Sequence, residues 1–424
     1  MSQLPRGTRD FTPEEMYIRR YIEESIRKTF LSFGYGEVQT PTFEHLELFT
    51  AKSGQSIINE LYNFTDKSGR ELTLRPELTA PVIRFYVERL QMEPKPLKLF
   101  YLGNCFRYDR PQKGRYREFW QAGCELIGAD TPEAYAELIA LAYTILHNIG
   151  LKDFHLNLGN LSLIQALFKK LSVSVNDQKN LLPLIDKSQF DELLDALKCL
   201  GLSSQIAEEV VALLQTSDIP QIQNFFNDTP EVHKELLKLR QIITLLQQSF
   251  QIPDVSVKLS IVRGLDYYKG LVFEIEAPKL GAEKQLCGGG SYDLVGLFGG
   301  KDVPTAGFAI GFDRSILALE TQNVIFPKPA LDIYIIPYDE TCIEKSFELA
   351  QLLRKDDYQV DVDLLRRGIG KSLKFASTKN ARHAIILGPD ELNRNVVMLR
   401  DMRSGEQQSI PVAELLTYLK KSRT

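Results

Sequence analysis

A leucine-rich block in the middle of the chain limits the folds that this sequence allows. Between residues 161 and 251 of the 424, apolar side chains recur at helical spacing and glycine is rare. Strand-like runs lie on both sides of the block, for example at residues 98–108 and 255–262. We therefore predict a sheet assembled from two separated parts of the chain, with the block as a helical insertion.

A proline-rich junction at residues 326–330 marks a second change of pattern. Before it, strand-like runs joined by hairpin signals indicate an antiparallel α+β domain. After it, strands and helices alternate in a βαβαβ order, which is typical of an α/β domain. We expect the α+β domain to comprise residues 1–160 and 252–325, the insertion residues 161–251, and the α/β domain residues 330–424.

Composition excludes several classes of protein. The net charge is −4, so any contact with nucleic acid must come from local patches. No apolar run has the length of a membrane span or forms the core of a signal peptide, and the five cysteines include no CxxC pair. We expect a cytoplasmic protein with reduced thiols and no membrane contact. The five histidines show no metal-ligand spacing, so we predict no metal site in the protein itself.

Two local patterns define the N-terminal region. Thr12 and Glu15 form a capping box before an amphipathic run, which predicts a long helix ending near Gly34. An extended segment follows, where Pro41 fits only at a sheet edge. Such an edge is often an interface.

The segment 110–121 contains four cations in eight residues, interleaved with aromatic side chains. Alone it would be a solvated basic loop. It lies between two strand-like runs, however, so we predict a hairpin whose tip reaches phosphates. With a second arginine-bearing strand at residues 261–274 and a glycine cluster at residues 287–293, it predicts a site for a polyphosphate and a small polar molecule.

Five motifs follow one another along the chain: LRPELTA at 74–80, FRYDRPQKGRYR at 106–117, RGLDYY at 263–268, GGSYD at 289–293 and GFAIGFDR at 307–314. Their order resembles that of class II histidyl-tRNA synthetases. The chain resembles this family from end to end, including the family's anticodon-binding module. The resemblance implies that ATP and histidine form histidyl-adenylate with Mg²⁺ assisting, that the histidyl group passes to the 3′-terminal ribose of tRNA(His), and that the protein is a homodimer.

The resemblance also assigns the cations. Arg107 matches the arginine on the α-phosphate, and Arg314 matches the one on the γ-phosphate and adenine; Arg115 would lie near the phosphates, and Gly311 would allow close backbone approach. Arg263 would contact both the α-phosphate and the histidine carboxylate, which makes it, with Arg107, the expected catalytic residue. The alternatives are ion pairs: at the surface for Arg107 and Arg314, and with Asp266 or Glu274 for Arg263.

Imidazole has two opposed nitrogens, so its recognition needs polar partners on both sides. By resemblance, Glu125 and Tyr268 contact the imidazole and Tyr292 lines the pocket. The group around the α-amine would comprise Glu77, Thr79 and Gln121. Ser291 departs from the family's GGRYD pattern, so a cation is expected to be missing near the pocket and the position carries no assigned role.

For tRNA, Lys113 at the loop tip would meet the acceptor end. A basic patch in the α/β domain would hold the anticodon stem through Arg366, Arg367, Lys371 and Lys374. The alternative for this patch is a solvated amphipathic helix. Two rival functions stay open: a histidine-sensing regulatory subunit of ATP phosphoribosyltransferase, and an RNA-binding protein with an inactive catalytic domain.

Overall fold

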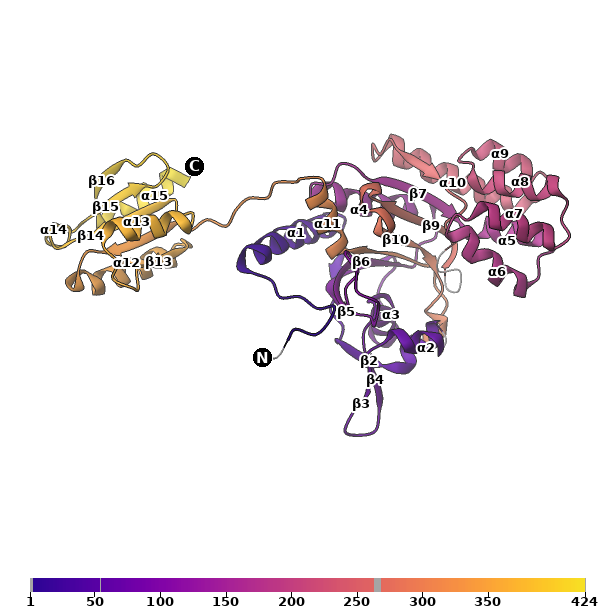
Figure 1. Cartoon of the computed structure of the whole chain (residues 1–424), viewed down its shortest axis with the longest axis horizontal. Helices are drawn as coiled ribbons and strands as arrows, with labels where there is room; N and C mark the ends of the chain where they lie inside the picture. Colours follow the sequence, from indigo (N-terminus) through magenta and orange to yellow (C-terminus); the bar gives the residue numbers. More distant parts are fainter. Residues whose placement is uncertain (1–2, 54, 263–267, 424) are drawn as a thin grey trace. The chain divides into compact units, whose positions relative to one another are not determined.

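The computed structural model describes residues 3–53, 55–262 and 268–423, and the chain forms two compact units, residues 1–325 and 326–424 (Figure 1). Each unit has its own sheet and its own hydrophobic core. No helix within the described ranges is long and apolar enough to cross a membrane.

An eight-stranded sheet forms the centre of the first unit, in the order β1-β5-β6-β11-β10-β9-β7-β8. The inner pairs are antiparallel, as predicted, whereas the two outermost pairs, β1 with β5 and β7 with β8, are parallel. The strands come from both sides of the insertion. Their bounds are β1 (Gly36–Glu37), β5 (Leu97–Phe106), β6 (Glu118–Ile127), β7 (His155–Asn160), β8 (Val255–Val257), β9 (Tyr268–Glu276), β10 (Gln285–Tyr292) and β11 (Thr305–Gly311).

Helices α1 (Pro13–Ser32), α4 (Pro132–Asn148) and α11 (Phe312–Thr321) belong to the same unit. The predicted capping box is present: the Thr12 hydroxyl accepts the Glu15 N–H at 3.3 Å, and the Glu15 carboxylate accepts the Thr12 N–H at 2.7 Å. Phe30 of α1 stacks on Phe100 of β5, with ring centroids 4.6 Å apart. Burial of such a side chain contributes about 1.5–3 kcal/mol, which fixes α1 on the sheet.

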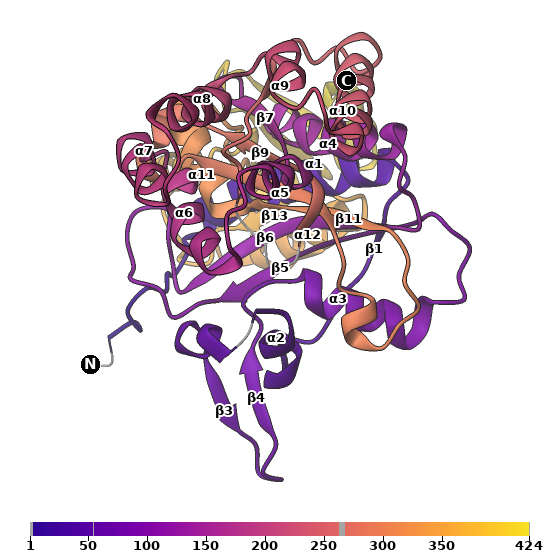
Figure 2. The same ribbon diagram turned by 90° about the vertical axis from the view of Figure 1, so that its right-hand side faces the viewer.

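A smaller sheet, β2-β4-β3, extends from the main body, and its hairpin projects beyond α2 (Figure 2). The predicted turn at residues 66–69 joins its last two strands in sequence, because Asp66 accepts the N–H groups of Ser68 and Arg70. The elements here are β2 (Phe43–His45), α2 (Leu46–Ser53), η1 (Gln55–Glu60), β3 (Asn63–Thr65), β4 (Glu71–Leu74), α3 (Thr79–Phe85) and η2 (Tyr86–Leu90).

The segment between β7 and β8 forms helices joined by short loops, as its leucine spacing predicts. Its helices are α5 (Leu161–Lys170), α6 (Val175–Asp186), α7 (Phe190–Cys199), α8 (Ser204–Gln215), α9 (Ile219–Phe225) and α10 (Pro230–Gln248). Lys238 of α10 donates to Asp130 at 2.6 Å, just before α4, which joins the insertion to the body of the unit.

Two predicted strands are shorter than expected. The run at 255–262 forms a strand only over β8. In the run at 261–274, residues 261–262 lie outside any strand, residues 263–267 lie outside the described residues, and residues 268–274 belong to β9. Ile261 and Val262 are buried outside any strand, so an apolar run alone did not define its secondary structure. Arg263 lies outside the described residues.

The second unit has a five-stranded sheet, β13-β12-β14-β15-β16. The βαβαβ order is confirmed, and β12, β13 and β14 are parallel; the antiparallel strands β15 and β16, which the sequence did not predict, complete the sheet. Its elements are β12 (Ile333–Pro337), η5 (Glu340–Cys342), α12 (Ile343–Lys355), β13 (Val360–Val362), α13 (Ile369–Thr378), β14 (His383–Leu387), α14 (Pro389–Asn393), β15 (Val396–Asp401), β16 (Gln407–Pro411), η6 (Val412–Glu414) and α15 (Leu415–Arg423).

Candidate active site

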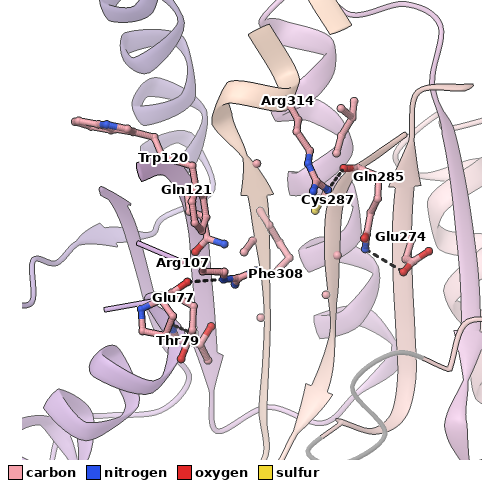
Figure 3. A pocket seen from close by; sticks show the side chains of 18 of the residues that line it. Glu77, Thr79, Arg107, Trp120, Gln121, Glu274, Gln285, Cys287, Phe308 and Arg314 are labelled. Atoms are coloured by element: carbon pink, nitrogen blue, oxygen red, sulfur yellow. Dashed lines mark hydrogen bonds between the residues drawn. The ribbon is translucent and has the colours of Figure 1, made fainter. Parts of the chain in front are cut away.

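A cavity of about 490 Å³ opens over the middle strands of the large sheet. It brings together ten of the residues that the sequence motifs single out, from segments far apart in the chain. They are Glu77, Thr79, Arg107, Arg115, Gln121, Glu125, Tyr268, Tyr292, Gly311 and Arg314. Figure 3 shows Glu77, Thr79 and Arg107 on one side of the cavity and Arg314 on the other.

The floor of the cavity holds a fully buried carboxyl group, that of Glu125 on β6. Tyr101 donates to its Oε1 at 3.0 Å, and Tyr292 donates to its Oε2. Burial raises the pKa of Glu125 to about 8, and the hydrogen bond from Tyr292 only partly offsets that effect. The group is therefore mostly protonated at neutral pH, and its side chain is held in one orientation.

Gly307 makes room for this carboxyl group, and Gly289 on the neighbouring strand allows the two strands to approach closely. A Cβ atom at Gly307 would lie 2.1 Å from Oε2 of Glu125, and one at Gly289 would lie 2.5 Å from the backbone oxygen of Gly307. A side chain at Gly307 would therefore collide with the carboxyl group, and one at Gly289 would collide with the backbone of β11. Glycine is required at both positions because neighbouring atoms lie too close for a Cβ atom, and not because the chain turns there.

Glu77 lies in the turn between β4 and α3. Its Oε2 accepts the N–H of Thr79 at 2.6 Å and its Oε1 accepts the N–H of Ala80 at 3.1 Å, so the first turn of α3 fixes the carboxylate. Carboxylate oxygens have further lone pairs. Glu77 can thus stabilise the helix and still accept from a ligand in the cavity.

Arg107 is fixed by contacts other than an ion pair. Its Nε donates to the backbone oxygen of Pro76 at 3.0 Å, and its guanidinium lies over the ring of Phe119, 5.2 Å from the centroid. No carboxylate within the described ranges lies within 4.0 Å of it. The expected alternative, a surface ion pair, is therefore not what holds this side chain.

Arg314, which lines the cavity, does form an ion pair. Its Nη2 lies 2.5 Å from Oε2 of Glu283, its Nη1 donates to the Gln285 oxygen at 3.1 Å, and its Nε donates to the Gly114 oxygen at 3.3 Å. Arg115 also contacts Glu283, at 3.2 Å. The two guanidiniums thus share one carboxylate, which the sequence motifs did not single out.

Asp313 is a second residue that the sequence analysis missed. Its Oδ1 accepts from Arg9 at 2.7 Å and from Arg19 at 2.8 Å, and its Oδ2 accepts the N–H of Trp120 at 2.8 Å. These bonds join the N-terminal segment, α1, β6 and α11 beside Gln121. The sequence did contain one indication of a buried charge here. Arg19 lies on the same helical face as the apolar Ile22 and Ile26.

Ser291 lies away from this cavity. Its hydroxyl donates to the backbone oxygens of Lys269 and Leu271, and it lines a neighbouring cavity of about 480 Å³ together with residues of α10. The serine hydroxyl thus faces the neighbouring cavity, and the expectation that a cation is missing near the ligand pocket stays a prediction.

The predicted tRNA contacts lie elsewhere. Lys113 is exposed at the tip of the β5–β6 hairpin. In the second unit, Arg366 pairs with Glu340, and Arg367 pairs with Asp363 at 2.8 Å. Lys371 and Lys374 are exposed on α13, and no carboxylate lies within 4.0 Å of either in the described part of the chain.

Comparison with known families decides which proteins this chain is related to. A family model described as histidyl-tRNA synthetase matches residues 7–314, and one described as an anticodon-binding domain matches residues 332–422. The chain belongs to the histidyl-tRNA synthetase family. The two matches fall within the two compact units and leave only a short connection between them.

Individual relatives of this synthetase family agree over the full length. A histidine--tRNA ligase of Methanosarcina acetivorans is 44% identical over 97% of each chain. The structure of histidyl-tRNA synthetase from Nostoc sp. PCC 7120 has the same fold, with a TM-score of 0.85 over 99% of each chain at 23% identity. A structure from Bacillus halodurans C is named as an ATP phosphoribosyltransferase regulatory subunit/histidyl-tRNA synthetase. It has a TM-score of 0.79 at 26% identity, and the match covers 92% of this chain and 98% of that chain.

Proposed function

We propose that this protein ligates histidine to tRNA(His) in two steps, formation of histidyl-adenylate from ATP and transfer of the histidyl group to the 3′-terminal ribose. One observation carries the proposal: a single cavity joins a buried carboxyl–tyrosine group to three guanidiniums, two from the β5–β6 hairpin and one from α11. The first set suits an imidazole, and the second suits a triphosphate.

In the first step, the histidine carboxylate attacks the α-phosphorus of ATP and pyrophosphate leaves. Both reactants are anions, so fixed positive charge lowers the barrier. Arg107 is assigned to the α-phosphate, and Arg314 and Arg115 to the outer phosphates. Gly311, where α11 begins, allows the nucleotide close to the backbone. Arg263 is assigned by its motif to the α-phosphate and the histidine carboxylate.

Mg²⁺ is proposed to accompany ATP. The described residues contain no group of three or more histidine, cysteine or acidic side chains that could hold a metal ion. Mg²⁺ is commonly held by one or two carboxylates together with phosphate oxygens. Glu274, which lines the cavity, is a fitting carboxylate of this kind, and the ion would neutralise phosphate charge there.

Histidine is assigned to the floor of the cavity. Glu125 and Tyr268 would bond the two ring nitrogens, with Tyr292 orienting Glu125. The ammonium group would lie among Glu77, Thr79 and Gln121, which reach the cavity from the side of β4 and β6. A mostly protonated Glu125 can donate to an imidazole nitrogen through its hydroxyl or accept from the ring through its other oxygen.

Lys113 is assigned to the tRNA acceptor end, and the cations of the second unit to the anticodon stem. Because Arg366 and Arg367 already pair with carboxylates, Lys371 and Lys374 are the better candidates for phosphate contacts. A homodimer through α1 and the segment around Pro41 is also proposed; Tyr17 and Tyr21 of α1 are 37% and 46% exposed. A cytoplasmic location fits these substrates.

The histidine-sensing regulatory subunit is the second candidate, because the Bacillus halodurans structure is named for both functions. It is less well supported, since such a sensor needs neither a set of triphosphate cations nor an anticodon-binding domain, and this chain has both. An RNA-binding protein with an inactive catalytic domain would not need the intact cavity.

Histidine-dependent exchange between ATP and labelled pyrophosphate tests the proposal, because only the synthetase catalyses it. We expect exchange in the wild type and a loss of most of it in Arg263→Ala, with the thermal unfolding midpoint unchanged. Absence of exchange in the wild type would reject the synthetase function. Near-normal exchange in Arg263→Ala would reject only the role given to that arginine.

A further inference from the structure

Glu283 lies at the end of η3 (Pro278–Glu283), where it contacts two arginines that line the cavity, Arg115 and Arg314. Its Oε1 accepts from Gln112 at 2.6 Å and from Arg115 at 3.2 Å, both at the tip of the β5–β6 hairpin. Its Oε2 contacts Arg314 of α11 at 2.5 Å. A single carboxylate therefore ties the basic loop to the helix that follows β11.

The loop tip itself is built to make this contact. Gln112 and Arg115 exchange backbone hydrogen bonds of 3.1 and 2.9 Å, and Gly114 between them has φ +82°. A Cβ atom at Gly114 would lie 3.7 Å from Cβ of Glu283 and 3.3 Å from Leu317 of α11. The tip thus lies closely against η3 and α11, with the side chains of Gln112 and Arg115 turned toward Glu283.

Burial gives the contact its strength. Glu283 is 9% exposed, whereas the side chains of Arg115 and Arg314 are 43% and 26% exposed. All three nitrogens of the Arg314 guanidinium contact oxygen atoms of the protein, those of Glu283, Gln285 and Gly114. Charge-assisted bonds of this kind restrict a flexible side chain to one geometry.

We propose that Glu283 is a positioning residue for the nucleotide: it fixes Arg115 and Arg314 side by side, so that ATP meets both guanidiniums already oriented. The inference rests on the proposed function. Pre-orientation removes the conformational entropy that two free arginines would lose on binding. The residue acts on ATP affinity through its two partners, and histidine binding at the floor is independent of it.

Exchange kinetics with Glu283→Gln test the inference. We expect the KM for ATP to rise about tenfold, which corresponds to about 1.4 kcal/mol, while kcat and the KM for histidine stay within about twofold. Gln112→Ala, which removes an exposed partner of the same carboxylate, should raise the KM for ATP about threefold. This second variant keeps the test valid if Glu283→Gln fails to fold.

Glu276→Gln is the matched control. Glu276 is also 9% exposed and contacts lysine, Lys284 at 3.2 Å, but it touches neither the loop tip nor α11. Its KM for ATP should equal that of the wild type. Amide hydrogen exchange over residues 110–117 should accelerate in Glu283→Gln and not in Glu276→Gln.

Two results would overturn the inference. An unchanged KM for ATP in folded Glu283→Gln would mean that the carboxylate positions nothing that ATP uses, and a lowered KM would mean that it competes with the phosphates. Both of these results can be obtained only if the wild type catalyses exchange. A wild type without exchange would instead reject the proposed function.

Discussion

The hydroxyl of Tyr101 donates to the carboxyl group of Glu125 across 3.0 Å at the floor of the cavity, where the two residues are 2% and 0% exposed. Thr79, in turn, lies 3.3 Å from the same tyrosine hydroxyl. The candidate imidazole contact and the candidate ammonium contact therefore belong to one hydrogen-bonded chain. A substitution at either end should affect the other.

The pKa of Glu125 predicts how stability depends on pH. Burial raises this pKa from 4.5 to about 8, so between these values the folded protein holds a proton that the unfolded chain releases. The group's contribution is complete below about pH 4.5 and is lost as the pH rises through 8. Its contribution to the unfolding free energy should fall by about 1.4 kcal/mol per pH unit across this window.

Urea unfolding of the wild type and of Glu125→Gln at pH 5, 6, 7 and 8 measures this slope. The wild type should lose stability relative to the variant as the pH rises, because glutamine does not titrate. A constant difference over the four values would contradict the raised pKa.

Arg107 is expected to contribute mainly to the rate of adenylate formation. Arg107→Ala should lower kcat for pyrophosphate exchange by about 10²–10³-fold, the usual loss for one fixed donor to a developing charge. Arg70→Ala removes an arginine of the β3–β4 hairpin that is 64% exposed and should leave exchange unchanged. If Arg107→Ala raised only the KM for ATP, the side chain would serve ground-state binding alone.

Asp313 is expected to contribute to the stability of the first unit. Asp313→Asn leaves two guanidiniums without their shared carboxylate, and Arg19 is only 4% exposed, so the unfolding free energy should fall by about 3–5 kcal/mol. Asp153→Asn breaks an exposed pair with Lys279 in the same unit and should cost less than about 1 kcal/mol. Equal losses in denaturant unfolding would show that burial of the Asp313 cluster adds nothing.

Lys371 and Lys374 are expected to act on tRNA alone. Alanine at either position should raise the KM for tRNA in aminoacylation and reduce the slope of log affinity against log salt by about 1, with pyrophosphate exchange unchanged. Lys420→Ala, whose lysine pairs with Asp356 at 2.6 Å in the same unit, is the control. A salt slope that stays at the wild-type value would place the RNA on another face.

Local chemistry explains what the sequence could predict. The capping box at Thr12 and the turn at Asp66 depend on atoms within four residues of each other, so their residue types define them. The order of the family motifs likewise identified ten residues that one cavity collects. Arg263, the remaining residue expected there, lies outside the described part of the chain.

The contacts that the sequence did not reveal join distant segments. Gln112 and Glu283 are 171 positions apart, and Arg9 and Asp313 are 304 apart. No local sequence pattern predicts either pair. An isolated glutamate or arginine is usually solvated, so the sequence alone indicates an exposed side chain at each of these positions. The parallel pairing at the sheet edges was missed for a similar reason, since strand patterns define a face and not a direction.

The parallel pairing of β7 with β8 also limits how the helices between them could be lost. The two strands run side by side in the same direction, with Leu156 beside Val255, so the chain leaves one end of the sheet and must return to the other. Parallel neighbours need a connection of about a dozen residues or more. A variant with a shortened insertion would therefore have to keep a connection of about a dozen residues between β7 and β8, or lose β8 from the edge of the sheet.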